Sequence, residues 1–92
     1  MLDLKDLQVF VTVYERRGFA RAAIELHTVQ SAVSARIRKL EALIEAPLFE
    51  RMHRAIAPTH SGERLYRHAK RVLAEVDDLP RVVNLAAEER AA

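Results

Sequence analysis

Residues 28–41, TVQSAVSARIRKLE, read as a short amphipathic helix with two very different faces. Val33, Ile37 and Leu40 recur at i, i+4 and i+7, the spacing of one apolar helix face. The other side carries the polar residues Gln30, Ser31, Ser34 and Arg38. These are hydrogen-bonding groups of several lengths with one cation, unlike the Glu/Lys mixture of an ordinary solvated face. The face therefore suits a partner that is rich in acceptors.

Length and composition limit what the rest of the chain can be. The 92 residues are enough for one small domain, whose modest core would gain from oligomerisation. The absence of cysteine excludes disulfides and thiolate metal sites, and no apolar run has the length of a membrane span. The start, MLDLKDLQVF, is acidic and periodic rather than a secretory signal. We therefore expect a cytoplasmic protein.

Charge is distributed unevenly along the chain. Residues 16–71 carry twelve Lys and Arg against five Glu, a net charge of +7, whereas residues 1–15 and 72–92 carry −2 and −3. A basic middle between acidic ends is the expected footprint of a polyanion site. Charge alone leaves a second interpretation open, an ordinary solvated surface.

Three helices are expected before residue 45. The first runs from Leu4 to about Arg17, with Asp3 as N-cap and Gly18 as its end. The second is short, residues 19–26, and Thr28 is the expected cap of a third helix over residues 29–44. A helix, a tight turn and a second helix over residues 19–44 make a helix-turn-helix layout.

After Pro47 the pattern changes to two short runs, residues 48–51 and 55–57, that can pair as a small wing. Thr59 is the expected N-cap of a last helix, and Pro80 predicts a kink or an end near Asp78. Apolar residues repeat along this helix in steps of 4, 3, 4, 3, as in a coiled-coil seam. The predicted dimerisation residues are Leu65, Ala69, Val72, Val76 and Leu79.

At this point the chain resembles the N-terminal DNA-binding domain of LysR-type transcriptional regulators. The resemblance is carried by LKDLQVFVTVYERRGFARAAIEL, HTVQSAVSARIRKLE, PLFER and THSGERLYRHAKRVL, in that order, and covers about residues 3–75. It implies a mainly α fold: a winged helix-turn-helix over residues 1–58 and a dimerising linker helix over residues 59–92. It also implies a homodimer on a dyad operator, a dimeric or tetrameric full-length protein, and a small-molecule effector bound by a further domain that this chain lacks.

Some positions depart from the family's common pattern. Val29 and Ser31 stand where Ser and Pro are usual on either side of Gln30, and Ala20 replaces a frequent Thr. Ala35 stands where many members have a long polar or basic residue, and Ala55 replaces the usual wing glycine. The fold assignment does not depend on these positions, whereas the base contacts and the turn at the wing tip do.

The resemblance gives the polar face of residues 29–44 a role, because the second helix of such a motif enters the major groove. Gln30 can bond bidentately to an adenine edge, and Ser31 and Ser34 can touch bases or phosphates. Arg38, two turns on, is expected on phosphate.

Cations outside this helix complete the predicted interface. Arg54 lies at the tip of the wing, residues 51–56, where a cation can enter the negative minor groove. Further phosphate contacts are expected from Arg51, Arg21 and Arg64. The alternative role for Arg51 is to brace Glu50.

Other functions have less support in the sequence. The four histidines match no known metal-ligand spacing, and no acid is placed to orient His27 beside Ser31 and Ser34 for catalysis. We therefore expect no metal, no cofactor and no enzymatic activity. The alternative function is a helical protein–protein dimerisation module that binds no specific DNA, in which the seam is the functional feature.

Overall fold

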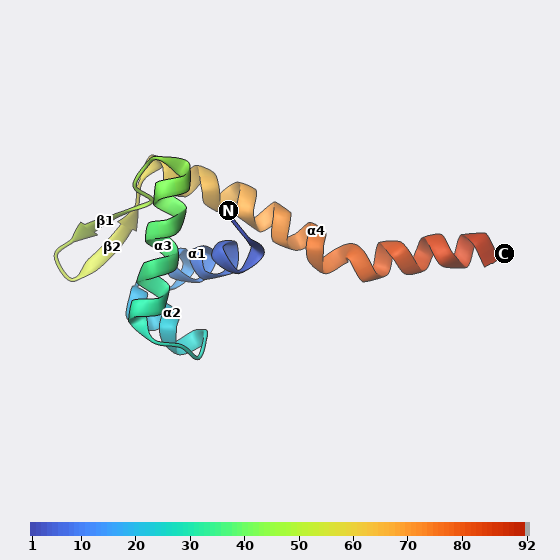
Figure 1. Ribbon diagram of the computed structural model, residues 1–92, viewed down its shortest axis with the longest axis horizontal. Helices are drawn as coiled ribbons and strands as arrows, with labels where there is room; N and C mark the ends of the chain where they lie inside the picture. The colour runs from blue at the N-terminus through green and yellow to red at the C-terminus, as the bar shows by residue number, and fades with distance from the viewer. Residues whose placement is uncertain (92) are drawn as a thin grey trace.

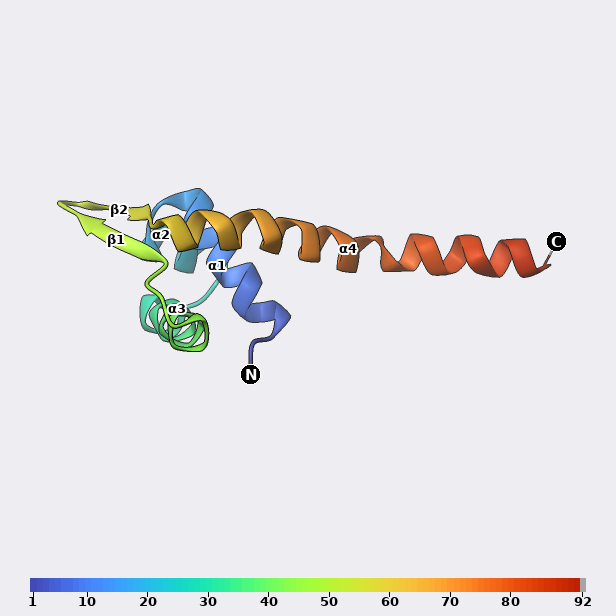
Figure 2. The same cartoon turned by 90° about the horizontal axis from the view of Figure 1, so that it is seen from above.

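The computed structural model describes the backbone of residues 1–91 and the side chains of residues 1–85. Its elements follow in the order α1 (Leu4–Arg16), α2 (Phe19–Glu25), α3 (Gln30–Ile44), β1 (Phe49–Met52), β2 (Ala55–Pro58) and α4 (His60–Ala91). Helices α1–α3 form a body, from which the hairpin projects on one side while α4 extends away on the other (Figures 1 and 2). The predicted winged helix-turn-helix with a long final helix is confirmed.

Helix α1 begins at a reciprocal cap. The Asp3 carboxylate accepts a hydrogen bond from the Asp6 amide, and the Asp6 carboxylate accepts one from the Asp3 amide. The expected role of Gly18 at the other end is wrong: the left-handed residue that closes α1 is Arg17, with φ 55°. Gly18 is extended and serves as the N-cap of α2. The guanidinium of Arg17 lies over the Tyr14 ring, 4.7 Å from its centroid, which compensates part of the cost of that backbone.

Helix α3 starts one residue later than predicted and without the predicted cap. The N-cap is Val29, which has no side-chain acceptor, so the Thr28 hydroxyl is one position too early to cap the helix. The Val29 carbonyl instead accepts hydrogen bonds from the amides of Ala32 and Val33. The turn before it passes through His27 in the left-handed region, with φ 55°.

The wing is an antiparallel hairpin in which Phe49 pairs with Pro58 and Met52 with Ala55. Phe49 fixes its base to the body, because its ring lies 5.4 Å from that of Phe10 and 6.1 Å from that of Phe19. Two residues, His53 and Arg54, therefore make the exposed tip.

Thr59 caps the start of helix α4, and its hydroxyl accepts a hydrogen bond from the Gly62 amide as predicted for an N-cap. The helix does not end near Asp78; it passes through Pro80 and continues to Ala91. Proline removes one backbone hydrogen bond and bends the axis without requiring the helix to stop, and Figure 1 shows α4 changing direction part-way along. Ala92, the end of the range expected for the linker, lies outside the described residues.

The first turns of α4 belong to the core of the body. Tyr66 stacks on Tyr14 of α1 with ring centroids 3.8 Å apart, and Ala69 is 1% exposed. Leu65 also packs against the core. The expectation that Ala69 meets a second subunit therefore needs correction, because its own domain already buries it, whereas Leu65 is half-buried. The exposed part of the apolar stripe starts at Val72.

Candidate nucleic-acid interface

The two faces of α3 separate as the periodicity predicts. Val33, Ile37 and Leu40 are buried in the core, together with Phe10 and Leu48. On the other side Gln30, Ser31 and Arg38 are exposed and Ser34 is half-buried. The core contact therefore fixes which side of α3 faces outward, and the outward side is the polar one.

A groove of about 390 Å³ joins the start of α2, the start of α3 and the wing. It brings together four of the predicted site residues from separate elements: Arg21, Gln30, Arg51 and Arg54. Its remaining lining residues are Arg17, Gly18, Phe19, Ala20, His53, Ala55 and Ile56, so no acidic side chain lines it. An amide with both donor and acceptor atoms thus lies in a groove with four arginines, which suits an anionic ligand that presents hydrogen-bonding edges.

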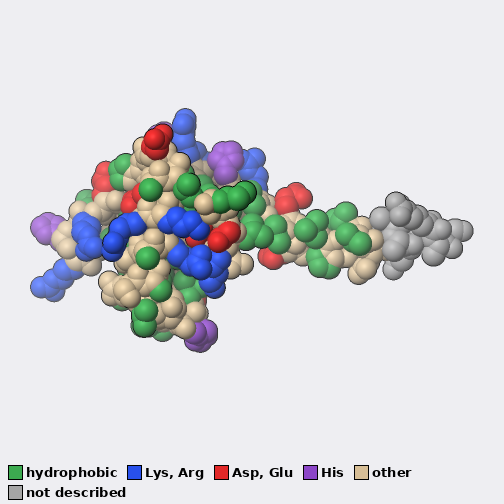
Figure 3. All heavy atoms as spheres, viewed as in Figure 1, with side chains coloured by type: hydrophobic (Ala, Val, Ile, Leu, Met, Phe, Trp, Pro, Cys, Tyr) green, Lys and Arg blue, Asp and Glu red, His purple; other side chains and the backbone are tan. Residues whose placement is uncertain are grey.

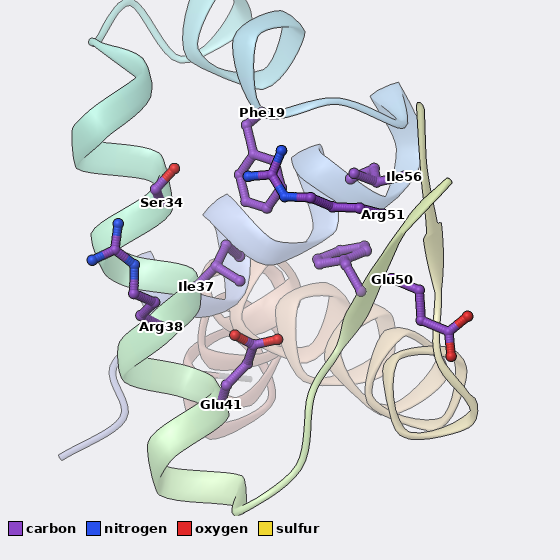
Figure 4. Close-up of a pocket in the computed structure, with 9 residues that line it drawn as sticks. Phe19, Ser34, Ile37, Arg38, Glu41, Glu50, Arg51 and Ile56 are labelled. Atoms are coloured by element: carbon purple, nitrogen blue, oxygen red, sulfur yellow. The ribbon is translucent and has the colours of Figure 1, made fainter. Parts of the chain in front are cut away.

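A second hollow, of about 190 Å³, lies further along α3 between that helix and β1. Ser34 and Arg38 line it from α3, and Figure 4 shows Arg51 reaching from β1 across Phe19 toward α3. Two acids, Glu41 and Glu50, also line it, and the Glu41 carboxylate accepts a 2.8 Å hydrogen bond from the Leu48 amide. This hydrogen bond connects α3 to Leu48, the residue that directly precedes β1 of the wing.

The wing tip holds Arg54 outward without the glycine that the family usually has there. His53 takes the left-handed conformation instead, with φ 50°. Histidine is among the residues that adopt this region more often than most side chains do. The tip therefore turns at His53 and needs no glycine at position 55. Arg54 lines the groove.

The cations of the body divide into paired and unpaired sets. Arg16 is bound to Glu25, and Arg36 and Lys39 to Asp3 and Asp6. Within residues 1–85, none of the predicted site cations has an ion-pair partner: Arg21, Arg38, Arg51, Arg54 and Arg64. Figure 3 shows Lys and Arg side chains gathered in a band over α3 and the wing. The unpaired charges are available to an external anion.

Not every predicted residue lies in these hollows. Ser31 is exposed on α3 but lines neither, and Arg64, near the start of α4, lines neither. Sequence reasoning missed Arg17 and His53, which both line the groove. Arg17 belongs to the basic middle of the chain, but its left-handed backbone, which places it at the groove, has no signal in the sequence.

The described residues contain no group of three or more His, Cys, Asp or Glu side chains arranged to hold a metal ion. No described helix combines the length and apolar character needed to cross a membrane.

Residues 4–63 match the family model described as "Bacterial regulatory helix-turn-helix protein, lysR family". The chain belongs to the LysR family. It is 47% identical over 77 residues to the HTH-type transcriptional regulator CfxR of Cupriavidus necator, which covers 84% of this chain and 24% of that relative. It is 40% identical over 77 residues to the regulator DgdR of Burkholderia cepacia, which covers 84% and 26%. The LysR chain described here thus spans about a quarter of the length of these relatives.

Solved structures agree with this assignment. The DNA-binding domain of BenM, in complex with catB site 1 DNA, matches with a TM-score of 0.86 and 31% identity, covering 94% of this chain and 96% of that one. The DNA-binding domain of CbnR in its DNA complex matches with a TM-score of 0.87 and 30% identity, covering 94% and 99%. The chain is the DNA-binding domain of a LysR-type regulator, and these findings give no support to the alternative of a protein–protein module.

Proposed function

We propose that α3 lies in the major groove of double-stranded DNA with Gln30, Ser31 and Ser34 toward the base edges. The observation that carries this proposal is the acid-free groove in which Gln30 lies among four arginines. A glutamine amide matches the donor and acceptor of adenine in the major groove. Arg38, further along the same face, is placed to meet phosphate.

The wing and α2 hold the flanking backbone in this arrangement. Arg54 at the wing tip enters the minor groove beside the major-groove site, where the potential is negative. Arg51 and Arg21 contact phosphates on either side of Gln30, since all three line one groove. Arg64 lines neither hollow, so we assign it at most a peripheral phosphate contact.

A second chain is expected on the outer part of α4. The apolar stripe of α4 packs on the body as far as Ala69. Beyond the body it is exposed, with Val72 43% and Leu79 54% exposed. Val76 is half-buried between them. One chain cannot cover this stripe alone, so we propose a homodimer whose two α3 helices read a dyad operator. The dimerisation residues are then Val72, Val76 and Leu79, with the half-buried Leu65 at the start of the stripe and without Ala69.

The whole protein is proposed to regulate transcription, as the names of its relatives suggest. We propose the cytoplasm as the place where it acts. We also propose an effector site and a tetrameric state for the whole protein. Both rest only on its membership of the family.

Salt dependence tests the DNA interface directly. The DNA is an operator obtained by selection from a random oligonucleotide pool, and affinity is measured across a range of salt concentrations. If Arg21, Arg38, Arg51 and Arg54 each displace counterions in both subunits, log K should fall against log salt with a slope near about −7. A flat salt response, or a pool that yields no preferred sequence, would contradict the proposal.

A further inference from the structure

Asp6 is a buried carboxylate that binds two cations of the recognition helix. Its side chain is 0% exposed, and it lies on α1, thirty residues before Arg36. One oxygen, Oδ1, is 2.9 Å from Nη1 of Arg36, and the other, Oδ2, is 2.8 Å from Nζ of Lys39. The Asp3 amide donates a further hydrogen bond to Oδ2 at 3.0 Å. Both carboxylate oxygens are therefore satisfied.

The charge of Asp6 is maintained by these partners. Burial on its own raises the pKa of Asp6, but the hydrogen bonds from Lys39, the Asp3 amide and Arg36 together hold that pKa below its ordinary value. Hydrogen bonding by Asp6 correspondingly raises the pKa of Lys39. At neutral pH the cluster is thus a fully ionised carboxylate between two cations.

The two cations lie on the flank of α3 next to α1, away from the side that carries Gln30 and Ser34, and neither lines the two hollows. Positions 36 and 39 are i and i+3, one turn apart, so a single carboxylate holds two consecutive turns of the helix. Their side chains remain 38% and 39% exposed, so solvent still reaches them. Released from Asp6, the flexible arginine and lysine on this flank would be free to turn toward the phosphates on that side of the helix. Arg38, between them in sequence, has no ion-pair partner within residues 1–85.

We propose that Asp6 is a positioning residue for DNA recognition, which fixes the rotation of α3 and keeps Arg36 and Lys39 off the phosphates. This inference rests on the proposed placement of α3 in the major groove. Contacts to phosphate carry no sequence information and supply most of the non-specific affinity. By withholding two cations, Asp6 lowers affinity for all DNA and leaves the base contacts of Gln30 and Ser34 to decide between sequences.

The test compares the 92-residue chain with its Asp6→Asn variant on two DNA duplexes, the selected operator and poly(dI-dC). The expected result is a steeper salt slope, by up to about 0.9 per released cation, because each one displaces counterions. Affinity for poly(dI-dC) should rise and the ratio of operator to poly(dI-dC) affinity should fall. Adding Lys39→Gln to Asp6→Asn should return the slope part of the way to the wild-type value.

Asp3→Asn is the matched control, because it removes the same charge from the same cluster and Asn is an equally good N-cap. Asp3 lies further from the cations, at 3.5 Å from Arg36 and 3.8 Å from Lys39, so its variant should change the slope less than Asp6→Asn does. Equal changes in the two variants would reduce the effect to net charge and overturn the proposal. A folded Asp6→Asn variant with unchanged slope and ratio would also overturn it.

Two further variants keep the test informative if Asp6→Asn fails to fold. In the wild-type background Arg36→Gln and Lys39→Gln should leave the salt slope unchanged, since neither cation contacts DNA. A shallower slope in either would show that these cations already bind phosphate, against the proposal. Arg38→Gln separates this failure from failure of the DNA interface itself. If α3 lies in the groove with Arg38 on phosphate, this variant should have a shallower salt slope, whatever the role of Asp6.

Discussion

The hydroxyl of Tyr66 on α4 donates a hydrogen bond of 2.6 Å to the carboxylate of Glu15 on α1. Lys70, one turn further along α4, lies 3.4 Å from the same carboxylate oxygen. The Tyr66 ring also stacks on Tyr14, so two neighbouring residues of α1 hold one side chain of α4. This contact sets the direction in which the long helix leaves the DNA-binding body, and with it the geometry of a dimer.

Tyr66→Phe tests the hydrogen bond separately from the stack. The variant keeps the ring on Tyr14 and leaves Glu15 with Lys70 alone, so the free energy of unfolding should fall by about 1 kcal/mol. Tyr14→Phe is the control, because within residues 1–85 the Tyr14 hydroxyl makes no hydrogen bond and its loss should change little. Urea denaturation of both variants measures the difference. Equal losses would mean that the hydrogen bond from Tyr66 to Glu15 adds no stability of its own.

Acid should weaken the same contact. The hydrogen bond from Tyr66 lowers the pKa of Glu15, with Lys70 adding to the effect against the opposing influence of burial. A carboxyl whose pKa is lower in the folded state contributes stability above its unfolded value, about 4.3, and loses it as pH falls through the folded value. The melting temperature should therefore fall between about pH 5 and the folded pKa, and fall less steeply in Glu15→Gln. Parallel pH profiles for the two proteins would contradict this account.

Gly62 is required by the close approach of α4 to the start of the wing. A Cβ at this position would lie 2.2 Å from the carbonyl oxygen of Leu48, which also accepts the Thr59 amide. Gly62→Ala should cost about 1–3 kcal/mol of stability or more, because backbone must shift. Gly18→Ala meets only the flexible Arg21 side chain, at 3.7 Å, and should cost no more than about 1 kcal/mol as a weaker N-cap. Thermal melts that rank Gly18→Ala as the worse variant would be inconsistent with this packing.

A charge on the exposed seam of α4 should separate the two subunits. Val72→Glu places a like charge on each chain at a buried interface, which should cost several kcal/mol of dimer stability. Ala74→Glu adds the same charge nearly opposite on the helix and should leave the dimer intact. Sedimentation equilibrium reports the mass of each. A monomeric wild-type protein would mean that there is no dimer. A dimeric mass for all three proteins would place the dimer contact away from Val72.

How far the sequence predicts this domain depends on the range of the interactions. The division of α3 follows from a helical period of 3.6, because Val33, Ile37 and Leu40 must face one core. The wing follows from two short runs between Pro47 and Pro58. In contrast, Gly62 appears in the sequence as a tolerable cost in the first turn of a helix. Its importance arises from Leu48, fourteen residues away, and periodicity carries no information about such a contact.

The same limit applies to the interface. Polar residues on one face of α3 identify Gln30, Ser34 and Arg38 as candidates, and the structure gathers Gln30 with Arg21, Arg51 and Arg54. The sequence does not show that Arg36 and Lys39 are bound to Asp6 whereas Arg38 is unpaired, because all three are cations on one helix. Nor does it show that Leu65 and Ala69 cover α1, since an apolar stripe looks the same whether its own domain or a partner covers it.

The central claim, that α3 reads bases through Gln30, is tested most directly by measuring Gln30→Ala against every single base-pair substitution in one half-site of the selected operator. The account predicts that the variant loses discrimination at one position, by about 1–3 kcal/mol, with its salt slope unchanged, because a base contact and no phosphate contact is removed. Gln8→Ala, the same change at an exposed position of α1, should preserve the full pattern of preferences. A uniform loss of affinity on all sequences, with every base preference retained, would contradict the account and make Gln30 a backbone contact.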